Sequence, residues 1–238
     1  MKKTEITALI VSYYRGDRLR KCIETLRDLP NIIVWDNNTQ GEELEKIKQI
    51  DKDFDNVEVI YSTENLGCTG AWNQGLIRSK TDWVLLCSDD MKFDDDWFEV
   101  LNDILEERPY LEQIHLNAWN AFVFHKKTIV RMGWWDEGYR YYPSMEDDDW
   151  YLRTVEELGY SPYGNFAPHI PYPQWYVDTV KPHIDNRKRL VDLEDNFTYY
   201  CNSEHSKHKI IGQSTIRDKR MMREVVTILK VAWIVVTQ

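Results

Sequence analysis

Four short apolar runs, at residues 6–11, 32–35, 57–61 and 83–87, constrain the fold of this chain more than any other feature. Runs this short and this apolar are typical of strands that are covered on both faces of a sheet. The segments between them repeat apolar side chains with a period of about 3.6 residues, which is typical of helices with one buried face. The alternation predicts an α/β fold with a Rossmann-like, mostly parallel central sheet, right-handed crossovers and flanking helices.

The regular pattern extends to residue 107, and the sequence after it is less regular. This second half contains an apolar stretch at residues 114–124 and an aromatic-rich segment at residues 134–142. A helix is expected over residues 146–158. We therefore expect an irregular second half that completes the fold begun by the regular first half.

The domain boundaries follow from this change of pattern. We expect one domain over residues 1–212, with a regular half at 1–107 and an irregular half at 108–212. Residues 213–238 are basic and apolar and are expected to form a C-terminal helix. Its apolar part, residues 225–236, is too short to cross a bilayer. Packing on this domain or on a following one is favoured, and the alternatives are an interfacial membrane helix or the edge of a longer polypeptide.

The composition excludes some classes of partner. The chain has 238 residues with 30 Lys+Arg against 40 Asp+Glu, a formal charge of -10, which disfavours nucleic acid as a partner. Its four cysteines form no CxxC pair, so neither a zinc framework nor a disulfide scaffold is indicated. A reducing, cytoplasmic location is the simplest interpretation, with membrane association through the C-terminal segment as an alternative.

Carboxylates follow two of the predicted strands directly. Ser88, Asp89 and Asp90 follow the run at 83–87, and Asp36 follows the run at 32–35. Ligands bind at this edge of open α/β sheets. Adjacent carboxylates can hold a hard cation such as Mn²⁺ or Mg²⁺, the alternative being a helix cap or a solvated acidic turn.

Asp36 is followed by two amides, Asn37 and Asn38. A carboxylate here could accept the ring N–H of a pyrimidine, while one of the amides reaches base or ribose oxygens. The alternative is an Asx-turn that only reverses the chain. The sequence leaves these two interpretations open.

Two further segments carry candidate chemistry. Residues 65–73 place glycines before a helix, expected at 71–79, where backbone can approach a diphosphate. Four acids at residues 146–149 open another helix, and their repulsion raises some carboxylate pKa values, as suits a base. The alternative for the acids is compensation of the helix dipole. His169 and His183 are either structural or metal ligands.

The order of these pieces is more specific than any one of them. The segments ALIVSYYRGDRLRKCIETL, IVWDNNTQ, NLGCTGAWNQGL, WVLLCSDDMKFDDDW and GWWDEGYRYYPSMEDDDWYLRTVEELGY resemble the successive motifs of the glycosyltransferase A (GT-A) fold, family 2-like. The resemblance covers residues 6–172. The motif that is Asp-X-Asp in the family begins here with Ser88.

The resemblance implies roles for individual residues. Asp36 would bind the base, Asp89 the ribose region and Asp90 the metal, while Asp147 would be the catalytic base. His169 falls where the family often has a metal-binding His, with His183 as the alternative. The remaining nucleotide-binding candidates are Ser12, Tyr14, Asn38, Asn65, Gly67 and Asn73.

The acceptor site is expected in the aromatic segment that precedes the acids, because flat rings with polar tips suit the C–H faces of sugars. The alternative for these rings is a small satellite core. The candidates are Trp134, Trp135, Tyr141 and Glu146.

Helix geometry separates the four acids. Because successive residues are turned by about 100°, they cannot all face one cleft. Asp149 can pair with Arg153 at i,i+4 spacing, which would make Asp149 structural and leave Asp147 to face the acceptor.

The predicted function is a metal-dependent, inverting glycosyltransferase that takes a sugar from a nucleotide diphosphate sugar to a hydroxyl of a glycan or similar acceptor. UDP is the favoured nucleotide and dTDP is possible, because uracil and thymine offer the same N–H edge. The alternative is a catalytically silent sugar- or nucleotide-binding module that retains the fold. A nicotinamide enzyme is disfavoured because residues 12–16 contain no GxGxxG turn.

Overall fold

The computed structural model describes residues 1–117, 120–138, 146, 149–150, 153–154 and 157. In this part of the chain, strands form one six-stranded sheet in the order β3-β2-β1-β4-β6-β5. β1 to β4 are parallel to their neighbours within that group, whereas β6 is antiparallel to both β4 and β5. The strands are β1 (Ile6–Ser12), β2 (Ile32–Asp36), β3 (Val57–Tyr61), β4 (Trp83–Ser88), β5 (Gln113–Asn117) and β6 (Ala121–His125).

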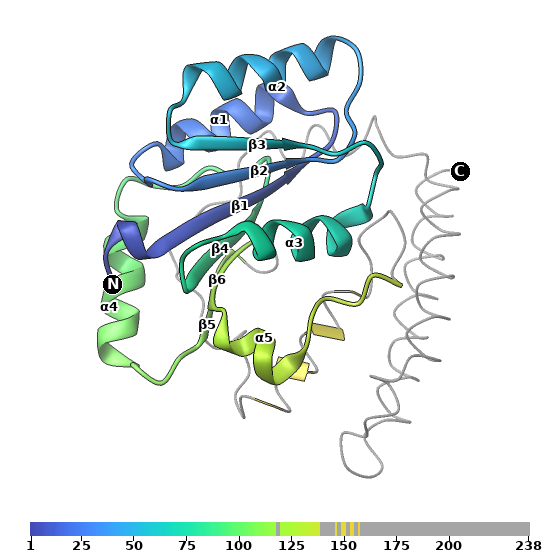
Figure 1. Ribbon diagram of the computed structural model, residues 1–238. Coiled ribbons are helices and arrows are strands. Elements are labelled where there is room, and N and C mark those ends of the chain that lie inside the picture. Colours follow the sequence, from blue (N-terminus) through green and yellow to red (C-terminus); the bar gives the residue numbers. More distant parts are fainter. Residues whose placement is uncertain (118–119, 139–145, 147–148, 151–152, 155–156, 158–238) are drawn as a thin grey trace, which may run out of the picture.

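Helices lie on both faces of this sheet, which confirms the predicted α/β architecture (Figure 1). The buried side chains of α1, α2 and α4 belong to one core cluster. Those of α3 and α5 belong to a second cluster on the opposite face. The helices are α1 (Gly16–Leu26), α2 (Glu42–Asp53), α3 (Gly67–Arg78), α4 (Trp97–Glu107) and α5 (Lys127–Met132), preceded by a short 3-10 turn, η1 (Lys3–Glu5).

β1 shows why the central strands are apolar throughout. Its side chains alternate between the two clusters, with Ala8 and Ile10 in the first and Leu9 in the second. All three are fully buried. Because both faces of the strand are covered, a polar side chain is tolerated only where the strand ends, and the site described below begins there.

The second cluster is built largely from aromatic rings. Trp135 stacks on Trp150 with ring centroids 4.0 Å apart and an interplanar angle of 10°. Phe124 contacts Trp150 edge-on, and Trp72 of α3 packs against Trp135. This packing joins α3 to the segment that follows α5, and so joins the regular half of the chain to the irregular half.

Two elements differ from the sequence-based expectations. The apolar stretch at 114–124 is not one element but parts of β5 and β6, which pair antiparallel and add the last two strands of the sheet. α3 begins at Gly67, four residues before the expected start at 71, so that the glycine-rich segment forms its first turns. Apolar content alone does not reveal where a run folds back on itself.

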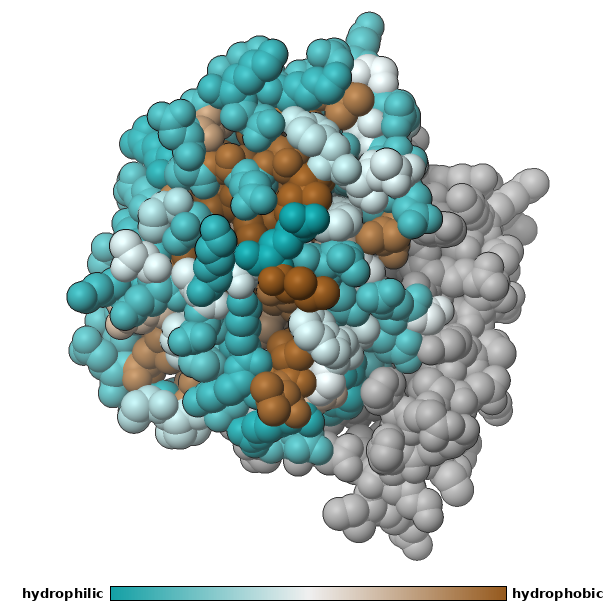
Figure 2. All heavy atoms as spheres, in the orientation of Figure 1, coloured by the Kyte–Doolittle hydropathy of each residue, from teal (hydrophilic) through white to brown (hydrophobic). Residues whose placement is uncertain are grey.

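The outer faces of α1 and α2 are polar, as expected of helices that bury a single stripe (Figure 2). α2 buries only Ile47 and Ile50. Every helix in the described part of the chain is too short or too polar to span a membrane. His169, Tyr141, Asp147 and the C-terminal segment at 213–238 lie outside the described residues.

α3 packs closely against the sheet at Gly75. A Cβ atom there would lie 2.3 Å from Cδ1 of Leu9, whose side chain is fully buried. We expect Gly75→Ala to lower the free energy of unfolding by about 1–3 kcal/mol through overpacking. Denaturant unfolding checks this, with exposed Gln74→Ala on the same helix as the control. A Gly75→Ala variant as stable as the control would contradict the close packing.

Candidate active site

The strands β1, β2 and β4 end at the same edge of the sheet. Ser12 at the end of β1 is in register with Asp36 of β2, and Val11 is in register with Ser88 of β4. The polar residues that follow each strand are therefore neighbours, although they are far apart in the sequence. The structure thus brings Ser12, Asp36, Asp89 and Asp90 to one edge, as the sequence predicted.

Asp89 is buried but has partners from the end of β1 and the loop after it. The Ser12 hydroxyl donates a hydrogen bond of 2.8 Å to Oδ2, and Nη1 of Arg15 lies 3.3 Å from Oδ1. The residue is only 4% exposed, and this burial raises the pKa of Asp89 to about 6. The nearby Arg15 charge opposes the increase in pKa.

Asp90 is buried more completely. Its Oδ2 lies 3.3 Å from Nη1 of Arg15 and 4.0 Å from Nη1 of Arg18. Its Oδ1 is buried and has no hydrogen-bond partner within the described part of the chain. Burial raises the pKa of Asp90, and the two arginines oppose that effect. A carboxylate oxygen shielded from water in this way is a group that a divalent cation would satisfy.

A complete set of metal ligands is not visible in the described part of the chain. Across the described ranges, no group of three or more His, Cys, Asp or Glu side chains is placed to hold a metal ion. The donor set of Asp90, a hard carboxylate oxygen at a strand end, nevertheless fits Mn²⁺ or Mg²⁺. The remaining positions of such an ion would be filled by water, phosphate oxygens or residues outside these ranges.

Asp36 forms the turn that the sequence had left as an alternative. Its Oδ1 accepts a hydrogen bond of 3.2 Å from the backbone N–H of Thr39. Burial nevertheless raises the pKa of Asp36, which is 1% exposed. Next to it, Asn38 and Tyr14 both adopt positive φ, at 69° and 57°. The Tyr14 N–H donates to Oγ1 of Thr39, so the loops after β1 and β2 hold each other in these less common conformations.

Asn37 is a structural link that sequence reasoning treated only as a ligand candidate. Its Nδ2 donates to Oδ1 of Asn65 at 2.7 Å and to the Gly67 carbonyl at 3.2 Å. Its Oδ1 accepts from the Leu66 N–H at 2.8 Å. Gly67 has φ 71°, a conformation that favours glycine. The loop after β2 and the start of α3 are therefore fixed together, with Asn65 and Gly67 used at least partly for this purpose.

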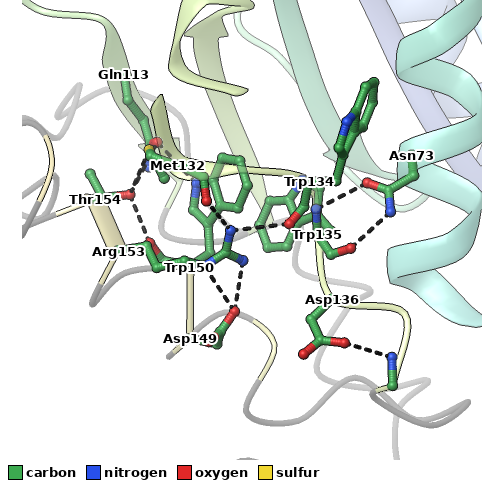
Figure 3. A network of polar contacts seen from close by, with 11 residues as sticks. Asn73, Gln113, Met132, Trp134, Trp135, Asp136, Asp149, Trp150, Arg153 and Thr154 are labelled. Atoms are coloured by element: carbon green, nitrogen blue, oxygen red, sulfur yellow. Dashed lines mark hydrogen bonds and ion pairs between the residues drawn. The ribbon is translucent and has the colours of Figure 1, made fainter. Parts of the chain in front are cut away.

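The side-chain amide of Asn73 is hydrogen-bonded to the segment that follows α5 (Figure 3). Its Nδ2 donates to the Trp135 carbonyl at 2.8 Å and to Oε1 of Glu137 at 2.9 Å. Its Oδ1 accepts from the Trp135 N–H at 3.1 Å. The sequence predicted a nucleotide ligand at Asn73, whereas the structure shows its amide bonded to the segment after α5 and the residue only 4% exposed.

The acceptor candidates divide into exposed and buried side chains. Trp134 is 49% exposed and could present its ring to a ligand. Trp135 is 2% exposed and belongs to the aromatic core, which is the alternative that the sequence had left open for these rings. Glu146 is also buried, at 4% exposure. Burial raises the pKa of the Cys68 thiol on α3 to about 12, and the negative charge of Glu146 adds to this increase. Glu146 therefore lies near the start of α3.

The predicted pair of Asp149 and Arg153 is confirmed (Figure 3). Nη2 of Arg153 lies 2.7 Å from Oδ2 of Asp149, and Nε donates to the same oxygen at 3.1 Å. Nη1 of Arg153 also donates to the carbonyls of Met132 and Trp134. This buried pair, called the Arg153 bracket below, fixes the chain leading to Trp134 and keeps the Asp149 carboxylate ion-paired.

Comparisons with known proteins show the family and the fold of this chain. Residues 7–151 match the model of the family described as Glycosyl transferase family 2. The comparison with curated protein sequences gives no match.

Two solved structures illustrate the similarity of the fold. One is the mannosyltransferase PcManGT from Pyrobaculum calidifontis in complex with GDP-Man and Mn²⁺, at TM-score 0.60 and 10% identity, covering 93% of this chain and 69% of the other. The other is S. aureus TarS 1-349 in complex with UDP, at TM-score 0.55 and 11% identity, covering 87% of this chain and 76% of the other.

Removing Arg153 would leave a buried carboxylate without its counter-charge. We expect Arg153→Ala to lower the free energy of unfolding by about 3–5 kcal/mol. The double variant Arg153→Ala/Asp149→Ala should lose less than Arg153→Ala alone, because no uncompensated charge remains. Lys48→Ala, which breaks the exposed pair with Glu45, is the control and should change stability little. Equal losses for the Arg153 and Lys48 variants in denaturant titrations would contradict a buried bracket.

Proposed function

The chain belongs to glycosyltransferase family 2, and we propose that it moves a sugar, with inversion, from a UDP-sugar to a hydroxyl of a glycan-type acceptor in a reaction that needs a divalent cation. The observation that carries this proposal is the pair Asp89–Asp90, buried at the carboxyl edge of the sheet beside Asp36. Burying adjacent carboxylates is costly for a fold, and such sites are commonly functional. A module that only bound sugar would not need them.

The donor is assigned to the edge formed by β1, β2 and β4. Asp36 would accept the N–H edge of the base, and Asp89, held by Ser12, would bind the ribose region. UDP is favoured because a pyrimidine presents that edge, and dTDP presents it equally. TarS has been solved with UDP and PcManGT with GDP-Man and Mn²⁺, which supports a nucleotide-sugar donor in general.

Asp90 is the residue assigned to the cation, because its Oδ1 is buried without a hydrogen-bond partner among the described residues. His169 is proposed as a second ligand, with His183 as the alternative. When bound, Mn²⁺ or Mg²⁺ supplies positive charge that stabilises the leaving diphosphate. Asp89 would meanwhile stay with Ser12 and orient the donor.

The acceptor side is assigned to the segment after α5. Trp134 and Tyr141 would bind the acceptor, with Glu146 supporting them from its buried position. Asp147 would take the proton from the acceptor hydroxyl as the sugar transfers. Because the Arg153 bracket holds the carbonyl of Trp134, the exposed ring starts from a fixed backbone position.

The experiment that tests this function is a screen of UDP-, dTDP- and GDP-sugars for donor hydrolysis and transfer with Mn²⁺. We expect UDP-sugars to turn over best. Asp90→Asn should lose about 10²-fold or more in rate, because a metal's contribution to the transition state is several kcal/mol. Asp95→Asn, an exposed acid five residues later, should be unchanged. Full activity in excess chelator would refute metal dependence, and binding without turnover would indicate a silent module.

The catalytic base is tested by amide substitutions within residues 146–149. We expect Asp147→Asn to lower kcat by about 10²–10⁴ while nucleotide and Mn²⁺ affinity stay unchanged. The neighbour Asp148→Asn removes the same charge one position away, and its effect should be mild. Transfer by Asp147→Asn at near the wild-type rate would show that another group is the base.

A further inference from the structure

Arg15 lies across the two carboxylates at the end of β4, and sequence reasoning gave it no role. One atom, Nη1, is 3.3 Å from Oδ1 of Asp89 and 3.3 Å from Oδ2 of Asp90. The residue precedes α1, in the N-cap position, on the loop that leaves β1. Its guanidinium therefore reaches the two aspartates from the loop after β1, and the side chain is partly exposed.

The two aspartates need a positive charge beside them. Their side chains are 5% and 1% exposed, so water screens their mutual repulsion poorly. Arg15 supplies that charge from a side chain that is 41% exposed. Both contacts are made by the same NH₂ group of Arg15, and both are longer than the roughly 2.7–2.9 Å of a strong charge-assisted hydrogen bond. The guanidinium can therefore exchange these long, partly exposed contacts with the aspartates for another anionic partner.

Asp90 offers a second indication. While Oδ2 faces Arg15, Oδ1 is buried and has no hydrogen-bond partner among the described residues. A doubly charged cation would compensate both aspartates better than one singly charged guanidinium does. It would also weaken the attraction between Asp90 and the guanidinium.

We propose that Arg15 is an internal counter-ion that a divalent cation displaces from Asp90, and that the displaced guanidinium then pairs with the diphosphate of the donor. This rests on the proposed function for the identity of the donor. No covalent bond of the protein is made or broken in the exchange: a hydrogen-bonded ion pair is replaced by coordination of the cation. Arg15 would thus favour a donor that arrives with its cation. The cation takes the place of Arg15 at Asp90, and the diphosphate gives the guanidinium a new anionic partner.

The chemistry of the side chain suits this second partner. A guanidinium presents planar, paired donors that match phosphate oxygens, and it stays charged at any working pH. Arg18 is less suited, since its side chain is 16% exposed and its Nη1 is 4.0 Å from Asp90. Arg15 has the greater exposure, and its loop lies at the same edge as the ends of β2 and β4.

The test is a pair of affinities that should move in opposite directions. In Arg15→Gln, Mn²⁺ alone, followed by electron paramagnetic resonance, should bind about three- to tenfold more tightly, because its competitor is gone. UDP at saturating Mn²⁺, followed by calorimetry, should bind about three- to tenfold more weakly, because a phosphate contact is lost. Arg20→Gln removes the same charge from α1, where it pairs with Asp53, and should change neither affinity.

Further readouts separate this role from a purely structural one. Mn²⁺ should raise the melting temperature of Arg15→Gln more than that of the wild type. Arg15→Lys, which keeps the charge, should shift both affinities in the same directions but less, and it serves if Arg15→Gln does not fold. Weaker binding of both Mn²⁺ and UDP, or no change in either, overturns the proposal.

The outcome for the wild type distinguishes this proposal from the proposed function. If the wild type binds Mn²⁺ and transfers sugar while Arg15→Gln behaves like Arg20→Gln, only the role of Arg15 fails. If the wild type binds no Mn²⁺, both the exchange and the metal requirement fail.

Discussion

The burial of Asp89 and Asp90 at the end of an apolar strand is the constraint on which the rest of this site depends. β4 is enclosed by β1 and β6, so its chain emerges from a core that excludes water. The two carboxylates that follow cannot be left alone in such a place. Ser12 and Arg15 compensate them from β1 and its following loop, which couples the chemistry of the edge to the packing of the central strands.

A second, separate constraint holds the other side of the site. Arg153 binds Asp149 and the carbonyls of Met132 and Trp134, while Asn73 holds Trp135 to α3. These contacts are supplemented by the stack of Trp135 on Trp150. Aromatic residues that looked like a ligand surface in the sequence are therefore partly a core, and only Trp134 among the described rings of this segment remains open to solvent.

The sequence predicted those features that depend on local pattern. Apolar runs predicted the four parallel strands, and i,i+4 spacing predicted the Asp149–Arg153 pair, because strand burial and helix periodicity leave a direct trace in consecutive residues. The strand-end positions of Asp36, Asp89 and Asp90 followed from the same pattern.

The features that depend on distant partners were not predictable in this way. The bond of Asn73 to Trp135 could not be predicted, because the two residues are 62 positions apart. An amide near a glycine-rich turn has the same local sequence whether it binds a ligand or a backbone. Arg15 was missed because Asp89 and Asp90 lie 74 and 75 residues later. The antiparallel β5–β6 pair was missed because the apolar pattern does not indicate where the chain turns between the two strands.

The most direct measurement is a crystal structure of the protein with UDP and Mn²⁺. We expect the diphosphate beside Asp90 with Arg15 turned toward it, and the uracil ring at Asp36. A nucleotide bound away from the ends of β1, β2 and β4, for example in the surface hollow that Lys3, Lys21 and Lys92 line, would contradict the assignment of this edge as the donor site.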